Sequence, residues 1–181
     1  MSIQTTFPSA GHHSKDAGAT YNGRQENKET MVFRNLLTTE LRFLGVKFIT
    51  DDDNETNREY QARINPGKGS VILDIHFNAG GPAASGTECF IANDASAHSQ
   101  EMAKEICNTA SSVMGIKNRG VKTEGQSQHN KIGILHQGAG TAVLWEICFI
   151  SNQDDMAKYD QNRGKLAKEI AKICKKYDDL R

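Results

Sequence analysis

Three places along the chain combine chemically versatile residues with positions beside apolar, strand-like runs. Gly11, His12 and His13 follow a short alternating run, and His76 stands near the end of the apolar stretch SVILDIHF. Glu146 lies inside the apolar run AVLWEICFI. Ligands of open α/β sheets bind at the carboxyl ends of the strands, so polar side chains at these ends are candidates for one functional site.

Glu146 is the most informative of these residues, because a carboxylate among apolar neighbours must be paired or neutral. One interpretation is that it forms an ion pair with an arginine. The alternative is a site carboxylate with a raised pKa, which suits a general base that works near neutral pH. Each histidine, taken alone, is also compatible with an ordinary hydrogen-bonded polar residue.

Two imidazoles from different strand ends and a carboxylate from the start of the first helix could together hold a zinc ion. His12, His76 and Glu26 can supply these groups. Such a set leaves a fourth position for water, as in catalytic rather than structural sites, and the metal lowers the pKa of that water. The chain has no compact H-E-x-x-H motif, so the fold must bring these residues together.

Helices are predicted where apolar residues recur at helical spacing. The first such segment is followed by Gly45, which stands where a C-terminal cap belongs, and the second is stopped by Pro66. The predicted helices cover residues 26–44, 55–65, 96–113 and 154–177.

Strands are predicted where short apolar or alternating runs lie between turn residues. The run 70–77 reads as a central strand buried on both faces, and Gly80, Gly81 and Pro82 break the chain after it. Residues 115–131 read as a polar loop. The other predicted strands run from Ile3 to Pro8 and over residues 46–49, 87–91, 132–135 and 142–149. Alternating strands and helices predict a single α/β domain over residues 1–181, with a twisted, mostly parallel sheet flanked by helices.

Composition excludes several classes of function. The chain has 181 residues, with 22 Lys plus Arg and 22 Asp plus Glu, so no basic field is available to bind nucleic acid. No apolar stretch approaches the ~20 residues of a membrane helix, and the first ten residues lack the features of a signal peptide. We therefore expect a protein that is made in the cytoplasm and does not insert into membranes. We also expect a monomer. The four cysteines are expected to be reduced core residues.

Six short strings, taken in order, resemble the zinc-dependent N-acetylmuramoyl-L-alanine amidases of bacterial autolysins and phage endolysins. They span nearly the whole chain. The strings are GHHSKDAGA (11–19), Glu26 at the head of the first helix, DIHFNA (74–79), GTECF (86–90), RGVK (119–122) and LWEICFISN (144–152).

The resemblance implies hydrolysis of the amide between the lactyl group of N-acetylmuramic acid and L-alanine of the peptidoglycan stem peptide. It implies that His12, Glu26 and His76 bind Zn²⁺ and that Glu146 is the catalytic acid and base. The same residues were candidates from their types and positions alone. The resemblance also implies a peptidoglycan substrate. In the endolysin setting, the protein would be made in the host cytoplasm and act on the cell wall during lysis.

Some positions remain open within this resemblance. Glu29 lies one helical turn from Glu26 and is the alternative ligand, although Glu26 falls where the family's ligand is found. His13 replaces a small residue and is expected only to cap its loop. Glu88 matches a family glutamate, and we expect it to form a salt bridge on its strand. Cys148 stands in place of a glycine.

Two other function classes compete with an amidase. A peptidoglycan-binding module without activity could share the fold, but it would be expected to lack the base or a metal ligand. A trimmed domain of a larger bacterial autolysin would look the same as an endolysin. A flavodoxin-like nucleotide binder is disfavoured, because the glycines after the first strand form neither G-x-G-x-x-G nor a P-loop.

Overall fold

The computed structural model describes residues 5–81 and 83–180, and a five-stranded sheet runs through it in the order β1-β4-β7-β5-β6. β5 is antiparallel to β7, and the other three pairings are parallel, so the sheet is mostly parallel as predicted. The strands are β1 (Thr6–Ala10), β4 (Val71–Asn78), β5 (Thr87–Ile91), β6 (Asn118–Thr123) and β7 (Thr141–Phe149).

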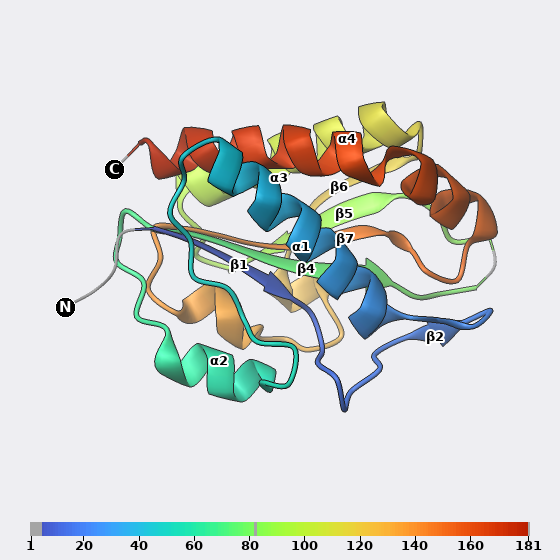
Figure 1. Ribbon diagram of the computed structural model, residues 1–181, viewed down its shortest axis with the longest axis horizontal. Helices are drawn as coiled ribbons and strands as arrows, with labels where there is room; N and C mark the ends of the chain where they lie inside the picture. Colours follow the sequence, from blue (N-terminus) through green and yellow to red (C-terminus); the bar gives the residue numbers. More distant parts are fainter. Residues whose placement is uncertain (1–4, 82, 181) are drawn as a thin grey trace.

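Three long helices cover one face of this sheet, and a short helix lies on the other (Figure 1). The long helices are α1 (Glu26–Phe43), α3 (Ala97–Met114) and α4 (Gln153–Asp178), and the short one is α2 (Asn57–Arg63). Their bounds lie close to the predicted ones. Phe33, Leu37 and Leu41 recur at four-residue intervals on α1 and are fully buried against the sheet, which is the packing that their spacing indicates.

The alternation of side chains along the strands separates two cores. On β4, Val71, Leu73 and Ile75 face the main core beneath the long helices, whereas Ile72 faces a smaller core that includes Tyr60 of α2. On the face of the smaller core, the residues that follow Ile72 at two-residue steps are polar. The polar ends of the strands therefore lie on the face of the sheet that carries the short helix α2.

The sheet edge beside β1 explains why residues 46–49 do not form a strand. Thr6 N donates to Lys47 O at 3.3 Å, and a single bridge joins Thr6 to Phe48. The next outward position on β1 is Pro8, which has no N–H group, so the ladder cannot continue. β1 itself extends past Pro8 to Ala10, while the predicted Ile3 lies outside the described residues.

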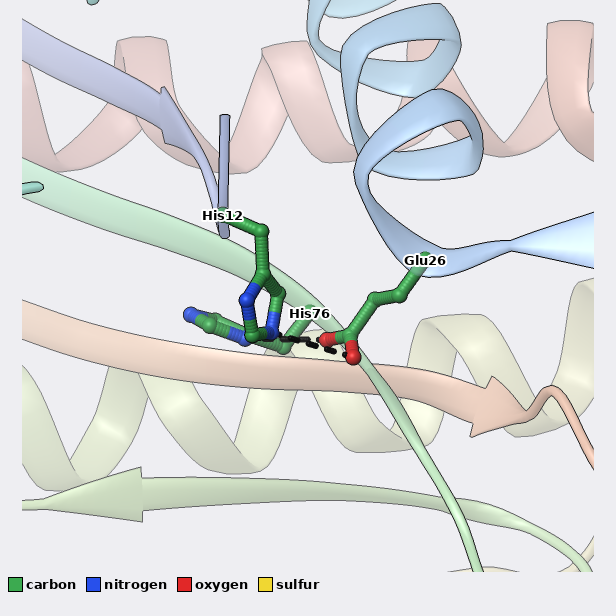
Figure 2. Close-up of side chains that lie close together, drawn as sticks. All are labelled: His12, Glu26 and His76. Atoms are coloured by element: carbon green, nitrogen blue, oxygen red, sulfur yellow. Dashed lines mark hydrogen bonds and ion pairs between the residues drawn. The ribbon is translucent and has the colours of Figure 1, made fainter. Parts of the chain in front are cut away.

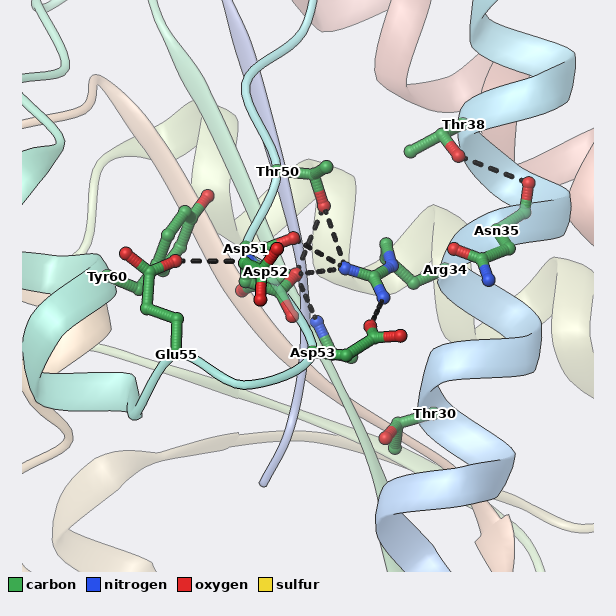
Figure 3. A network of polar contacts seen from close by, with 12 residues as sticks. Thr30, Arg34, Asn35, Thr38, Thr50, Asp51, Asp52, Asp53, Glu55 and Tyr60 are labelled. Atoms are coloured by element: carbon green, nitrogen blue, oxygen red, sulfur yellow. Dashed lines mark hydrogen bonds and ion pairs between the residues drawn. The ribbon is translucent and has the colours of Figure 1, made fainter. Parts of the chain in front are cut away.

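A buried ion pair lies at the end of β1 on this edge of the sheet (Figure 3). Asp51 Oδ1 accepts a hydrogen bond from Ala10 N at 3.1 Å and contacts Arg34 Nη1 at 3.0 Å. The Arg34 guanidinium also reaches Asp53 and donates to the carbonyl oxygen of Asp51 at 2.7 Å. Both Arg34 and Asp51 are buried. The network ties α1 to the end of β1, from which the next loop departs.

The strand predicted over residues 70–77 is confirmed as a buried strand inside the sheet, because β4 lies between β1 and β7, and β7 is the middle strand of the five. Besides the strand at 46–49, two predictions need correction. The predicted loop 115–131 contains the edge strand β6, whose partly exposed polar residues show no apolar alternation. The predicted strand 132–135 is instead a 3₁₀ helix, Gly133–His136, because so short an apolar run fits either structure.

One prediction from composition agrees with the structure. Cys89, Cys107, Cys148 and Cys174 are free and buried. None of the helices within the described ranges combines the length and the low polarity that crossing a membrane requires. Gly80 and Gly81 follow β4 as expected, and Pro82 lies outside the described residues.

Two glycine substitutions test the packing, one where a side chain has no room and one where it meets open space. A Cβ at Gly140 would lie 1.8 Å from the carbonyl oxygen of Lys68, so Gly140→Ala should destabilise the fold by about 1–3 kcal/mol. A Cβ at Gly164 on α4 would meet nothing within 4 Å, so Gly164→Ala should stabilise the helix by about 0.5–1 kcal/mol. Urea unfolding measures both, and equal effects of the two variants would contradict the packing described at Gly140.

Candidate metal centre

The loop after β1 brings His12 against two residues from distant parts of the chain (Figure 2). Gly11 N donates to Ile75 O at 2.7 Å, which extends the pairing with β4 by one residue. Thr30 Oγ1 on α1 donates to the carbonyl oxygen of Gly11 at 2.8 Å. His12 then adopts a φ of 68°, a left-handed conformation that is uncommon for residues with a side chain. The chain therefore leaves the sheet at His12.

Two glycines leave the space that the imidazoles occupy. A Cβ at Gly11 would lie 2.3 Å from His76 Cε1. A Cβ at Gly18 would lie 2.5 Å from His12 Cδ2 and 2.7 Å from Glu26 Oε2. Gly18 also has a φ of 61°. Glycine is thus required at both positions by the close approach of the site side chains.

Glu26 is the first residue of α1 and projects its carboxylate toward both histidines. Oε2 accepts a hydrogen bond from Ala19 N at 2.9 Å, and Oε1 accepts one from Phe77 N at 3.1 Å. The residue is only 4% exposed. A carboxylate at a helix N-terminus also interacts favourably with the helix dipole. Backbone groups from two other segments therefore fix the position of this carboxylate.

The three side chains form one compact cluster of potential metal ligands. His12 Nε2 lies 3.1 Å from Glu26 Oε2, and His76 Nδ1 lies 3.1 Å from Glu26 Oε1. One ligand atom from each residue lies within 4.8 Å of the others. Two imidazole nitrogens and one carboxylate oxygen at this spacing fit a catalytic Zn²⁺ site with an open position. The fold thus brings together the three residues proposed as ligands from the sequence.

The electrostatics of the cluster also suit a cation. Burial raises the pKa of Glu26, but hydrogen bonds with His12 and His76 outweigh burial and hold the pKa well below its usual value. Burial lowers the pKa of both histidines, but the nearby carboxylates outweigh it and raise both values. Glu26 is therefore ionised, and the site favours positive charge between its side chains.

Glu146 lies beside this cluster on β7. It is directly in register with His76 on β4 and with Glu88 on β5. Its Oε2 is buried and has no hydrogen-bond partner among the described residues. Burial raises the pKa of Glu146 to about 7, against the opposing effect of the nearby His76. Among the residues that the structure describes, Glu146 therefore does not form the ion pair with an arginine that was considered from the sequence.

Glu88, in contrast, is fully paired. Its Oε2 accepts hydrogen bonds from Arg119 Nε at 2.7 Å and Lys122 Nζ at 2.6 Å. Its Oε1 accepts one from Asn78 Nδ2 at 2.6 Å. Burial raises the pKa of Glu88, but the two cations outweigh that effect and lower it. The strand-borne salt bridge expected at this position is present.

The alternative ligand Glu29 and two further histidines lie outside the cluster. Glu29 contacts Arg24 Nη1 at 2.9 Å, so it is occupied elsewhere. His13 closes its loop through a backbone bridge with Asp16, as the capping role requires. His136 Nε2 contacts Glu124 Oε1 at 2.9 Å. These contacts leave Glu26 as the carboxylate that faces both histidines.

Two aspartates beside the cluster were not singled out from the sequence. Asp16 Oδ2 lies 2.9 Å from His12 Nδ1, and Asp74 Oδ2 lies 3.1 Å from His76 Nε2. Metal-binding histidines commonly donate their second ring N–H to a carboxylate. The sequence therefore did carry a signal for these contacts. One aspartate stands four residues after His12, and another stands two residues before His76.

The cluster and Glu146 line a cleft of about 800 Å³. Asn57 and Gln61 of α2 contribute to its wall, as do Lys122 and Phe90 on the sheet. Residues 126–129 and 131–134 also line it. The cleft therefore extends from the metal-ligand cluster along the polar strand ends, with space for a substrate much larger than water.

Comparison with known proteins identifies a family over most of the chain. Residues 9–176 match the family described as N-acetylmuramoyl-L-alanine amidase. The chain is 27% identical over 163 residues to the N-acetylmuramoyl-L-alanine amidase LytC of Bacillus subtilis. It is 29% identical over 155 residues to the endolysin of Bacillus phage SPP1.

These relatives are longer than the chain. The LytC match covers 87% of this chain and 32% of LytC, and the endolysin match covers 82% of this chain and 55% of the endolysin. A crystal structure of an N-acetylmuramoyl-L-alanine amidase from Clostridium difficile 630 has the same fold, with a TM-score of 0.80. That match has 22% identity and covers 98% of this chain and 97% of the other.

The requirement for space beside His12 can be tested with two glycines of similar backbone conformation. Gly18→Ala should lower the affinity for Zn²⁺ by about tenfold or more, the scale seen when groups supporting metal ligands are altered. Gly23 also has a positive φ, of 77°, but a Cβ there would meet nothing within 4 Å. Gly23→Ala should therefore retain the affinity. Calorimetric titration measures both, and equal losses would implicate backbone strain rather than crowding of His12.

Proposed function

The chain belongs to the N-acetylmuramoyl-L-alanine amidase family, and on that premise we propose that it hydrolyses the amide between N-acetylmuramic acid and L-alanine in peptidoglycan. The observation that carries this proposal is the position of Glu146. Glu146 is in register with His76 and lines the same cleft as His12 and Glu26. Its Oε2 is buried and has no hydrogen-bond partner among the described residues. A general base and a metal-ligand set therefore border the same space.

In this proposal His12, Glu26 and His76 hold Zn²⁺, because one ligand atom from each lies within 4.8 Å of the others. When bound there, Zn²⁺ would lower the pKa of a water molecule and polarise the scissile carbonyl group. The hydrogen bonds that Glu26 accepts from Ala19 N and Phe77 N hold its carboxylate in place during the reaction. Preorganised ligands of this kind need little rearrangement when the substrate binds.

Glu146 would move the protons of the reaction. Its Oε2 takes a proton from the attacking water, whose oxygen forms a bond to the carbonyl carbon. The C–N bond then breaks, and Glu146 returns the proton to the departing nitrogen of L-alanine. The products are a lactyl carboxylate and a free amino group. A carboxyl group with a pKa of about 7 can both accept and donate a proton near neutral pH.

The setting of this reaction is part of the proposal. The similarity to the SPP1 endolysin supports action on the bacterial cell wall during host lysis. The similarity to LytC supports the alternative of a bacterial wall enzyme. In both settings the proposed substrate is the muramyl peptide of peptidoglycan.

Metal removal and restoration test the proposed activity. Purified peptidoglycan incubated with the protein should release free amino groups of L-alanine. Chelation should abolish the release, and added Zn²⁺ should restore it, whereas added Mg²⁺ should not, because the ligand set contains two imidazoles. Binding to peptidoglycan without release of amino groups, with Zn²⁺ bound to the protein, would instead indicate a binding module.

The role of Glu146 can be separated from metal binding. Glu146→Gln should keep the affinity for Zn²⁺ and lower the rate of hydrolysis by about 10²- to 10⁴-fold, because an amide cannot take up the proton. Glu29→Gln is the matched control: Glu29 contacts Arg24, so its substitution should leave the rate unchanged. Hydrolysis by Glu146→Gln at the rate of the unmodified protein would exclude Glu146 as the base.

A further inference from the structure

The His76 ring lies between two carboxylates that contact its two nitrogens. Nδ1 is 3.1 Å from Glu26 Oε1, and Nε2 is 3.1 Å from Asp74 Oδ2. Asp74 precedes His76 by two residues on β4, so both side chains point to the same face of the sheet. Asp74 is 7% exposed. The strand itself therefore places a buried carboxylate against the nitrogen that faces away from Glu26.

Asp74 is held in this position by β1. Ser9 Oγ donates a hydrogen bond to Asp74 Oδ1 at 2.6 Å, and the two residues are in register across the parallel pair. Ser9 is also buried. One oxygen of Asp74 thus receives the Ser9 hydroxyl, and the other is left to accept a hydrogen bond from His76. Polar contacts therefore connect Ser9 to Asp74, Asp74 to His76, and His76 to Glu26.

We propose that Asp74 is a positioning residue that selects the form of His76 able to bind a metal. A neutral imidazole carries one N–H, and the other nitrogen has the lone pair that a metal needs. A carboxylate oxygen accepts hydrogen bonds and has none to donate, so Asp74 Oδ2, at 3.1 Å from His76 Nε2, places the N–H on Nε2. Nδ1 then presents its lone pair toward Glu26 and His12. This inference rests on the metal site proposed above.

The contact between His12 and Asp16 provides a contrast within the same cluster. Asp16 Oδ2 lies 2.9 Å from His12 Nδ1, but the Asp16 side chain is 53% exposed. Water can replace an exposed acceptor of this kind at little cost. Asp74 is buried, and its loss would leave the Nε2–H of His76 without an acceptor. The loss of Asp74 should therefore weaken metal binding more than the loss of Asp16.

Asp74→Leu tests the proposal, because leucine has nearly the same shape and no hydrogen-bond acceptor. The Zn²⁺ affinity of the purified protein, measured by competition with a chromophoric chelator, should fall by about 10- to 100-fold. Asp74→Asn should lose less affinity, since its amide oxygen still accepts a hydrogen bond from Nε2–H. This partial rescue by the conservative variant is not expected if the residue only fills space.

Asp155→Asn is the matched control for loss of a buried carboxylate. Asp155 is 1% exposed and accepts hydrogen bonds from Ser85 Oγ at 2.7 Å and Gly86 N at 2.9 Å. Neither it nor these partners is among the cleft-lining residues. Asp155→Asn should lower the stability to unfolding and keep the Zn²⁺ affinity of the unmodified protein.

The outcomes separate this inference from the proposed metal site. Unaltered Zn²⁺ affinity in folded Asp74→Leu would overturn the role of Asp74 while leaving the metal site intact. Failure of the unmodified protein to bind Zn²⁺ would overturn both. Should Asp74→Leu not fold, nitrogen chemical shifts of His76 in the unmodified, Zn²⁺-loaded protein decide the matter. A protonated Nε2 with metal on Nδ1 supports the proposal, and the reverse arrangement overturns it.

Discussion

The buried carboxylate of Glu26 is the interaction on which the candidate site depends. Its two oxygens accept hydrogen bonds from Ala19 N and Phe77 N and contact the imidazoles of His12 and His76. An isolated buried charge would be strongly unfavourable, and these contacts are what make it tolerable. The loop after β1, the strand β4 and the first turn of α1 therefore converge on one group. The two glycines beside the imidazoles leave the space in which they do so.

Two neighbouring glutamates show how the sheet sets different chemistry at adjacent positions. Glu88 and Glu146 are directly paired across β5 and β7. Arg119 and Lys122 lower the pKa of Glu88 against the effect of its burial, whereas burial raises the pKa of Glu146 to about 7. Pairs of carboxyl groups whose environments separate their pKa values are typical of acid and base sites. Glu88 therefore stays ionised beside its two cations, and the raised pKa of Glu146 suits the proton transfer proposed for it.

Local sequence patterns were sufficient for most elements and failed where tertiary pairing decides. The helices follow from apolar spacing, as Phe33, Leu37 and Leu41 on α1 illustrate. The edge strand β6 has no such pattern, because its formation depends on pairing with β5 rather than on a buried face. The hairpin of β2 (Thr20–Tyr21) and β3 (Arg24–Gln25) was also missed, although its Asn22–Gly23 turn is a strong local signal.

The sequence by itself determined the fold class and the family resemblance, because residue types and spacing carry that information. It also predicted His12, Glu26 and His76 as metal ligands and Glu146 as the base. It left open whether Glu26 or Glu29 faces the histidines and whether Glu146 has an ionic partner. Only the tertiary structure decided these points, since Glu29 contacts Arg24 while Glu146 Oε2 has no partner among the described residues. Such differences depend on contacts between segments far apart in the chain. For the same reason, only the structure revealed Asp74 behind His76 and Ser9 behind Asp74.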